Sequence, residues 1–177
     1  IPSELIDGND FFGKSSIQLL KHHGTYQQDH RDQRSRGEDG KSQKNFIFMV
    51  RSKIPGGIMT SDQLLAQMDL CDEIGNTTLR ITSRQGLQIH GVLKTDLAAT
   101  IQRIQQAQQT TLGACGDVCR NVMCSPSPSG DPLHLQIQDL AQRLAEHFAP
   151  RSSAFHDIWL TDTETGVREQ LPQEDTP

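Results

Sequence analysis

The sequence predicts an α+β fold built around an antiparallel sheet, and three observations support this prediction. The chain has 177 residues, of which 34% are hydrophobic, so it is long enough to bury a sizeable core. Between residues 46 and 124, apolar runs typical of strands alternate with segments in which apolar residues recur at helical spacing. Glycine and proline residues separate these segments. The predicted order is strand, helix, strand, strand, helix, strand.

The first strand of this region is followed by two cationic residues and a sharp turn. Residues 46–50 form a continuous apolar run, which is typical of a buried strand. Arg51 and Lys53 follow at the same parity and are expected on one face of the sheet. The Pro-Gly-Gly run at residues 55–57 stops the strand, because proline cannot continue a central ladder and glycine permits positive φ. The turn is either a close backbone approach to a ligand or an ordinary strand end.

Two helices flank a hairpin in this prediction. Thr60 or Ser61 is expected to cap the first helix, and Thr95 or Asp96 is expected to begin the second. The predicted apolar stripes are Leu64, Leu65, Met68 and Ile74 in the first helix, and Leu97, Ile101 and Ile104 in the second.

The hairpin joins strands at residues 79–82 and 87–92 through a turn at Gln85-Gly86. Alternation places apolar side chains on the core face and hydrogen-bond donors on the other face. The apolar set is Leu79, Ile81, Leu87 and Ile89, and the donor set is Arg80, Arg84, Gln88 and His90. Several guanidinium groups on one face are unfavourable unless negative charge binds there, which indicates an anion site. The solvated face of a half-exposed sheet explains the same pattern, and on pattern alone it is the more ordinary explanation.

The last predicted strand lies at residues 119–124, after a glycine-punctuated loop, and carries Arg120 and Asn121. With this strand the order becomes βαββαβ. This is the ferredoxin-like plan, in which helices cover one face of a four-stranded antiparallel sheet. The opposite face is then free to bind a ligand.

The flanking regions complete the predicted domain organisation. Residues 1–45 are expected to form an N-terminal extension with a short helix and a mobile loop, and residues 46–128 the ferredoxin-like half-domain. Residues 129–160 are expected to begin a following α/β domain, with an amphipathic helix at residues 133–148. Residues 161–177 are acidic and poor in core-forming residues, which predicts a disordered tail.

Charge and cysteine content argue against several classes of protein. The formal net charge of -5 gives no bulk attraction to nucleic acid or to an anionic membrane surface. No apolar run reaches the length of a membrane span, and no secretory signal pattern opens the chain, so a soluble protein is expected. The spacing of the four cysteines matches neither a zinc ribbon nor a dense disulfide framework, so structural or incidental thiols are expected, with no metal ligand.

Four motifs, taken together, resemble one family. They are HGTYQQDHRDQR at residues 23–34, FMVRSKIPGG at 48–57, TLRITSRQGLQIHG at 78–91 and LGACGDVCRNVMC at 112–124. The combination closely resembles the siroheme-containing assimilatory sulfite reductases, a hemoprotein type related to nitrite reductase, over residues 17–160. The segments around His90 and GTYQQDHRD resemble the sulfite branch of that family.

The resemblance implies the N-terminal part of an enzyme that reduces sulfite to hydrogen sulfide in sulfate assimilation. Such enzymes use siroheme bridged through a cysteine thiolate to a 4Fe–4S cluster. Catalytic roles are implied for Arg51 and Arg120, which would reach the bound sulfite, and Lys53 is expected to support either ligand. Contacts to the cofactor are implied for Arg80, Arg84, Gln88, His90 and Asn121. Siroheme carries many carboxylates, so an arginine-rich face is chemically suited to it.

The chain departs from the family pattern because it lacks the cysteine motifs that ligate the cluster. Cys115, Cys119 and Cys124 do not match those motifs, so the cluster ligands are expected outside this sequence, which is expected to be a fragment. The TLGACGDV stretch at residues 111–118 resembles the ferredoxin-dependent plant and cyanobacterial type. Ferredoxin is therefore the predicted electron donor, with an NADPH flavoprotein as the alternative. The expected location is the cytoplasm, or a plastid if a transit peptide has been removed.

Two other functions fit parts of the pattern. Residues 46–124 are alternatively a free-standing ferredoxin-like module that binds an anion without catalysis. RNA binding by such a module relies on stacked aromatic side chains, and the predicted hairpin contains none. A thiol-redox site at Cys115 and Cys119 would lack the Cys-x-x-Cys spacing of such sites.

The incomplete set of motifs predicts that this chain alone does not catalyse sulfite reduction. When the purified chain is mixed with a reduced electron donor and sulfite, the donor is expected to stay reduced, as followed by its absorbance. Oxidation of the donor that depends on both the chain and sulfite would contradict this prediction.

Overall fold

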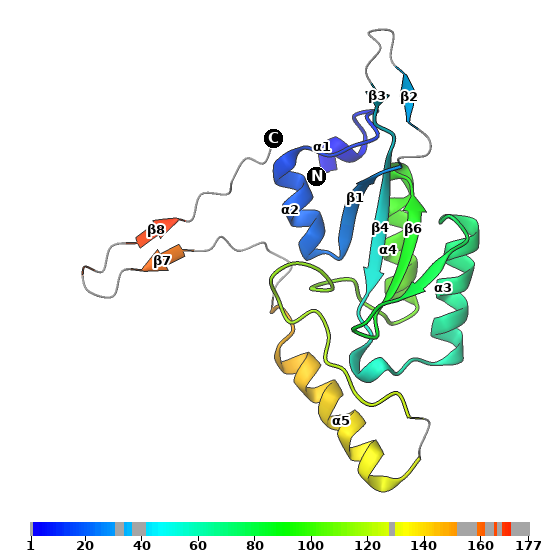
Figure 1. The fold of residues 1–177 in the computed structure, drawn as a ribbon, viewed down its shortest axis with the longest axis vertical. Helices are drawn as coiled ribbons and strands as arrows, with labels where there is room; N and C mark the ends of the chain where they lie inside the picture. The colour runs from blue at the N-terminus through cyan, green and yellow to red at the C-terminus, as the bar shows by residue number, and fades with distance from the viewer. Residues whose placement is uncertain are drawn as a thin grey trace.

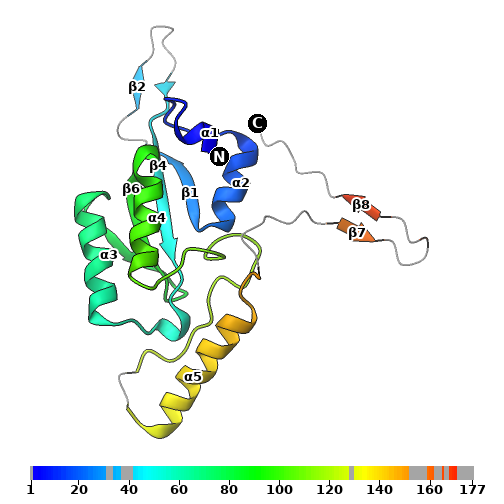
Figure 2. The ribbon, with the colours of Figure 1, turned by 180° about the vertical axis from the view of Figure 1, so that it is seen from behind.

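A four-stranded antiparallel sheet with strands in the order β1-β4-β6-β5 forms the centre of the fold (Figure 1). The computed structural model describes residues 2–30, 34–36, 42–127, 130–151, 159–161, 165 and 168–170. The strands are β1 (Thr25–Asp29), β4 (Phe46–Ser52), β5 (Leu79–Ile81) and β6 (Leu87–Val92). Figure 2 shows α3 (Ser61–Glu73) and α4 (Leu97–Gln106) on one side of this sheet. The predicted α+β class and the predicted antiparallel sheet are confirmed.

The remaining elements are one longer helix and several short pieces. They are α1 (Pro2–Leu5), α2 (Lys14–His22), the strand pair β2 (Ser35–Arg36) and β3 (Ser42–Gln43), the 3-10 turns η2 (Pro55–Gly57) and η3 (Lys94–Asp96), α5 (Pro132–His147), and the strand pair β7 (Trp159–Thr161) and β8 (Arg168–Gln170). The predicted mobile loop near residues 34–44 and the predicted tail at 161–177 lie largely outside the described residues.

The predicted strand at residues 119–124 is wrong, because this segment is irregular. The fourth strand is β1, which lies before β4 in the chain and pairs with it from Thr25 opposite Val50 to Asp29 opposite Phe46. After α4, an isolated bridge from Thr110 to Lys53 continues this edge of the sheet. With the position beside β4 already filled, residues 119–124 have no ladder to join.

The core lies between the sheet and the helices that cover it. Its fully buried members from the sheet are Phe48, Val50, Ile89 and Val92, and those from the two helices are Leu70, Leu97 and Ile104. The hairpin buries Leu87 and Ile89 as predicted, but Ile81 is 80% exposed. Ile81 is the last residue of the edge strand β5, where the hairpin begins to turn.

The predicted apolar stripe of α3 is mostly wrong. The helix begins as predicted, with a capping box in which Thr60 and Gln63 bond to each other's backbone N–H. The exposed fractions of Leu64, Leu65 and Met68 are 39%, 55% and 46%, whereas the buried residues are Gln67, Leu70 and Cys71. Burial of the Gln67 side chain is compensated in part by hydrogen bonds, because its Nε2 donates to Ser52 Oγ and Gln109 Oε1, both at 2.8 Å.

The amphipathic helix predicted at residues 133–148 is present as α5, which is capped by Asp131. Its small residues Ala141 and Ala145 are buried, and Ala141 lies close to Gly56 in η2. Its large apolar residues are exposed: Leu133, Leu135, Ile137, Leu140, Leu144 and Phe148. Among the described helices, none has the length and apolar content needed to cross a membrane.

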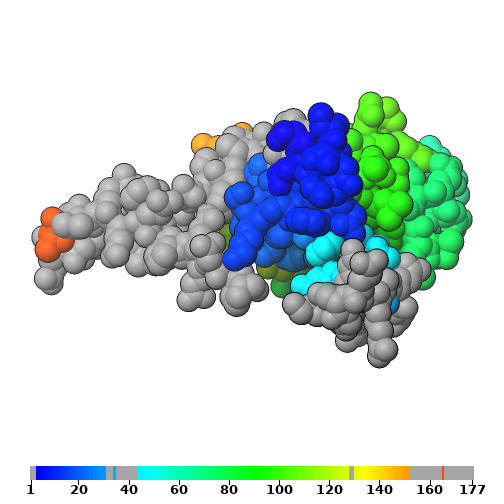
Figure 3. All heavy atoms as spheres, turned by 90° about the horizontal axis from the view of Figure 1, so that it is seen from above, coloured from blue at the N-terminus to red at the C-terminus, as the bar shows by residue number. Residues whose placement is uncertain are grey.

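A buried lysine fixes the N-terminal segment against the sheet and α4, and Figure 3 shows this blue segment beside the green surface of α4. Lys94 Nζ donates to Asp7 Oδ1 at 2.8 Å and to the Phe11 carbonyl at 2.9 Å. The same ammonium lies 4.7 Å from the centre of the Phe12 ring, which packs edge-on against Phe48. Burial of this cation is therefore compensated by a carboxylate, a carbonyl and an aromatic face.

The ion pair between Asp7 and Lys94 predicts a pH-dependent contribution to stability. The hydrogen bond from Lys94 is the main reason that the pKa of Asp7 is lowered from 3.8 to about 2. A carboxyl whose pKa is lower in the folded state stabilises the fold above its ordinary pKa, and that stabilisation is lost as pH falls through the folded value. Asp7→Asn is therefore expected to unfold at lower urea concentration than the wild type at pH 7, with the difference shrinking below pH 3.8 and vanishing near pH 2.

Asp69→Asn, an exposed change on α3, serves as the control and should track the wild type across the same pH range. A constant gap between wild type and Asp7→Asn from pH 7 to pH 2 would show that the ion pair is not the source of the stability difference.

Candidate functional site

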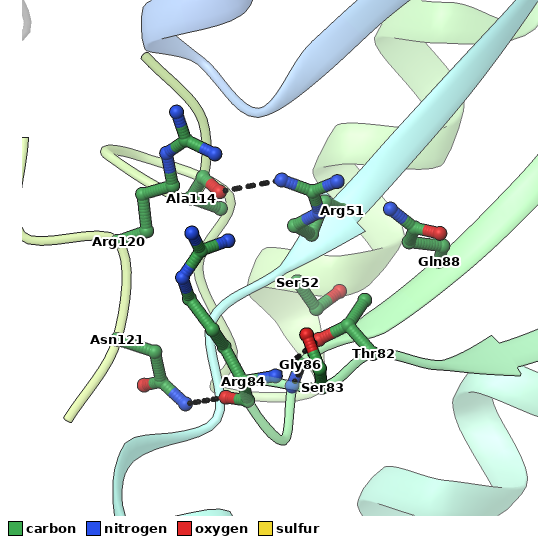
Figure 4. Close-up of a pocket in the computed structure, with 10 residues that line it drawn as sticks. All are labelled: Arg51, Ser52, Thr82, Ser83, Arg84, Gly86, Gln88, Ala114, Arg120 and Asn121. Atoms are coloured by element: carbon green, nitrogen blue, oxygen red, sulfur yellow. Dashed lines mark hydrogen bonds between the residues drawn. The ribbon is translucent and has the colours of Figure 1, made fainter. Parts of the chain in front are cut away.

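Three arginines from different parts of the chain surround one cavity of about 220 Å³ (Figure 4). Arg51 comes from β4, Arg84 from the turn of the hairpin, and Arg120 from the irregular segment that follows α4. Among the described residues, the lining is Arg51, Ser52, Thr82, Ser83, Arg84, Gly86, Gln88, Ala114, Arg120 and Asn121. No acidic residue is part of this lining, so the cavity is a cationic site with neutral polar walls.

The charges of these three arginines are not compensated within the described part of the chain. Other arginines do have acidic partners: Arg34 pairs with Asp29, Arg103 with Glu73 and Arg143 with Asp139. No ion pair among the described residues involves an arginine of the cavity. Uncompensated guanidinium groups around a small cavity favour the binding of an anion.

Arg51 is held by neutral acceptors. Its Nη1 donates to the Ala114 carbonyl at 3.3 Å, and its guanidinium lies 5.9 Å from the centre of the Tyr26 ring. The side-chain amide of Gln88 satisfies its neighbours when its oxygen faces Arg51, where it accepts from Nε at 3.0 Å and also from Nη2. Gln88, predicted as a cofactor contact, therefore lines the cavity and also orients Arg51.

The hairpin turn places Arg84 at the mouth of the cavity. Thr82 Oγ1 accepts from the backbone N–H of Gly86 at 3.0 Å and of Arg84 at 3.3 Å, which closes the turn. Gln85 takes a positive φ of 59°. Its side chain then leaves the hairpin: Nε2 donates to the Cys124 carbonyl at 2.6 Å, and Oε1 accepts from Cys124 N at 3.1 Å. Sequence reasoning placed Gln85 in the turn but missed this contact.

Asn121 joins three segments behind the cavity. Its Nδ2 donates to the Ile54 carbonyl at 2.7 Å and to the Arg84 carbonyl at 2.8 Å. Beside it, Val122 O accepts from Gly56 N at 2.8 Å. These bonds replace the ladder of the predicted strand and fix the backbone that carries Arg120, whose Nε donates to the Gly116 carbonyl at 2.7 Å. Asn121 was predicted to contact the cofactor, and its amide donors are directed to the backbone.

Three further residues with predicted roles do not line the cavity. Arg80 is exposed on β5 opposite Gln88. His90 lies next to Gln88, and its pKa is lowered by burial and, to a smaller extent, by the charges of Arg80 and Arg51. Lys53 is buried with its Nζ on the Cys119 carbonyl at 3.1 Å, and this burial lowers its pKa. Lys53 therefore supports the segment before Arg120 and does not face the cavity.

The cysteines near the cavity are free thiols. Cys115 and Cys124 are buried and Cys119 is partly exposed. Burial raises the pKa of Cys115, and the nearby charges of Arg51 and Arg120 oppose that shift. In the part of the chain that the structure describes, no group of three or more His, Cys, Asp or Glu residues is arranged to hold a metal ion.

Comparisons with known proteins show which family the chain resembles. Residues 40–107 match the family described as the nitrite/sulfite reductase ferredoxin-like half domain. The sulfite reductase (NADPH) hemoprotein beta-component of Thiocapsa roseopersicina is 43% identical over 154 residues, which are 87% of this chain and 28% of that protein. The protein of the same name from Paenibacillus sp. is 47% identical over 142 residues, which are 80% of this chain and 25% of that protein. The chain thus spans about a quarter of the length of these relatives.

A solved structure supports the fold. The NirA protein of Mycobacterium tuberculosis superposes with a TM-score of 0.66 over 94% of this chain and 35% of the solved chain, at 20% identity. The ferredoxin donor predicted from residues 111–118 finds no support in these comparisons, because the two curated relatives above carry NADPH in their names.

The contacts of Asn121 predict that its removal loosens the site. In Asn121→Ala, the carbonyls of Ile54 and Arg84 lose their donor, which is expected to cost roughly 1–3 kcal/mol of unfolding free energy. Urea denaturation measures that loss, and hydrogen exchange should show faster exchange of Gly56 N–H, whose acceptor is Val122 O. Met123→Ala changes an exposed side chain of the same segment and should leave both quantities near wild type. Unchanged exchange at Gly56 in Asn121→Ala would mean that Asn121 does not hold the segment.

Proposed function

We propose that the chain supplies the siroheme and sulfite contacts of a sulfite reductase. The proposal is supported by the match of residues 40–107 to the nitrite/sulfite reductase ferredoxin-like half domain and by the similarity of the chain to sulfite reductase hemoproteins. The proposed reaction of the parent enzyme is reduction of sulfite to hydrogen sulfide. The observation that carries the proposal is the set of three arginines without acidic partners around one cavity.

The residues present fit a carboxylate-rich cofactor. The cavity lining offers guanidinium and hydroxyl donors, and its described residues include no carboxylate that would repel such a group. Arg84 is exposed at the mouth of the cavity, and Arg80 continues the cationic surface along the open face of the sheet. Gln88 and His90 lie beside Arg80 and are proposed to contact the cofactor as well. Siroheme, when bound, would supply the redox centre together with a 4Fe–4S cluster whose ligands are expected outside this sequence. This chain's part in the reaction is to bind and orient.

Arg51 and Arg120 are the proposed sulfite contacts. Arg51 uses three of its N–H groups on Ala114 and Gln88, and Arg120 uses Nε on Gly116, so both keep Nη groups for the oxygens of an oxyanion. Guanidinium groups hold their protons too tightly to act as acids at neutral pH. Their proposed role is therefore to neutralise the anion and to polarise its S–O bonds while protons arrive from water.

The electron donor is proposed from the relatives. Both curated relatives described above are named as NADPH-dependent components, so an NADPH flavoprotein is the first candidate. Ferredoxin, predicted from one stretch of sequence, is the second. A functional assay of the parent enzyme with each donor separates them.

A second candidate function is anion binding without catalysis. It is favoured by one observation: among the described residues, those that line the cavity all lie between Arg51 and Asn121, so one segment of the chain supplies these direct contacts to an oxyanion. The two candidates differ in whether siroheme binds.

The proposal predicts different effects for two sets of arginine variants. Arg80→Ala and Arg84→Ala are expected to weaken the binding of siroheme. The affinity is measured by titrating siroheme into the chain and following its visible absorbance. Sulfite binding to the siroheme-loaded chain should be weakened about tenfold or more by Arg51→Ala and Arg120→Ala, because each removes a charged hydrogen-bond donor. Arg143→Ala, which removes an exposed arginine of α5, is the matched control and should bind both ligands as the wild type does.

Unchanged sulfite affinity in both Arg51→Ala and Arg120→Ala would remove their proposed role. Sulfite or sulfate binding by a chain that takes up no siroheme would instead favour the anion-binding module.

A further inference from the structure

A line of hydrogen-bonding side chains crosses the open face of the sheet and ends at Arg51. Gln28 lies on β1 and His90 on β6, and their side chains meet over the intervening strand β4, with Gln28 Oε1 3.2 Å from His90 Nδ1. The other ring nitrogen, Nε2, lies 3.4 Å from the side-chain amide of Gln88. Gln88 in turn contacts Arg51, its partner in the register of β4 and β6. The line therefore joins three strands of the sheet.

The chemistry of arginine sets the direction of every bond in this line. A guanidinium can only donate, so the oxygen of Gln88 must face Arg51. The NH2 group of Gln88 then faces His90 Nε2, which must accept. A neutral imidazole that accepts at Nε2 carries its proton on Nδ1, and this N–H donates to Gln28 Oε1. The two contacts of Arg51 with the oxygen of Gln88 thus predict that His90 is the tautomer with its proton on Nδ1.

We propose that Gln28 and His90 are positioning residues for Arg51, acting through the amide of Gln88. The line, together with the Ala114 carbonyl, occupies three of the five N–H groups of Arg51 and leaves two for a ligand in the cavity. Fixing the guanidinium before the ligand arrives removes the cost of ordering it on binding. This inference rests on the proposed function in taking the cavity as the oxyanion site.

Protonation of His90 would break the line. With N–H groups on both ring nitrogens, His90 needs the oxygen of Gln88, and Gln88 would then turn its NH2 group toward the donors of Arg51. The charges that face His90 are Arg80 from β5 and Arg51 from β4, and β1 contributes the uncharged Gln28. Burial and these two cations lower the pKa of His90, so the line is intact at neutral pH and is lost as pH falls through the lowered value.

The first test reads the tautomer of His90 directly. Nitrogen chemical shifts of the imidazole, measured by NMR on the full chain without any ligand at pH 7.5, are expected to show the proton on Nδ1. A proton on Nε2 would overturn the proposal, because Gln88 would then present its NH2 group to Arg51.

The second test compares variants of Gln28. Gln28→Leu removes the acceptor for Nδ1–H, and is expected to speed the exchange of the Arg51 Nε proton and to weaken sulfate binding roughly threefold to tenfold, the range for one neutral hydrogen bond. Gln28→Glu keeps an oxygen acceptor and is expected to restore slow exchange. Gln102→Leu makes the same change on the exposed face of α4 and serves as the matched control. Wild-type exchange of Arg51 Nε–H in Gln28→Leu would overturn the proposal.

The third test uses pH. Sulfate does not titrate between pH 5 and 8, so a fall in its affinity toward low pH reports the protein. The wild type is expected to show this fall and His90→Gln is expected to show none, whereas equal pH profiles would overturn the proposal. Because tautomer and proton exchange are read without ligand, a chain that binds no sulfate would count against the proposed function and not against the positioning of Arg51.

Discussion

The repulsion among Arg51, Arg84 and Arg120 is the constraint on which the site depends. Three like charges around a cavity of about 220 Å³ would move apart if their side chains were free. Carboxylate partners would hold them but would also cancel the charge that an anion needs. The chain instead uses neutral acceptors, the carbonyls of Ala114 and Gly116 and the amide of Gln88, so that Arg51 and Arg120 are held while their charge remains available.

The use of backbone carbonyls as acceptors for arginine explains why the chain after α4 is irregular. A regular strand would direct its carbonyls into a ladder, whereas the loop before Arg120 must offer carbonyls to side chains. The carbonyls of Cys124 and Val122 in this segment therefore accept from the side chain of Gln85 and from the N–H of Gly56. The side chain of Asn121 in turn donates to the carbonyls of Ile54 and Arg84, which ties the segment to its neighbours. A pattern of residues cannot reveal this, since an apolar and polar alternation such as CRNVMC is compatible with a strand until the position of β1 beside β4 is known.

Local signals in the sequence were sufficient to predict much of the fold. The wrong predictions share one cause, which is that they depend on contacts between residues distant in sequence. The hairpin, the start of α3 and the strand before Arg51 follow from parity, a capping box and an apolar run, all of which act over a few residues. The stripe of α3 was misassigned because burial of Gln67 depends on Ser52 and Gln109, which are distant in sequence. The site residues Arg51, Arg84 and Arg120 were predicted by resemblance, while their supports were visible only in three dimensions.

The prediction of the electron donor from a short stretch of sequence has the same limit. The ferredoxin prediction rested on residues 111–118, and this stretch contains Ala114 and Gly116, whose carbonyls hold Arg51 and Arg120. Gly113 and Gly116 adopt φ of 68° and 95°, values that suit glycine and shape the loop around those two contacts. The sequence of the loop is thus constrained by its contacts to these two arginines, so its resemblance to one branch of a family does not identify the electron donor. A donor must instead be identified from the surface that it touches.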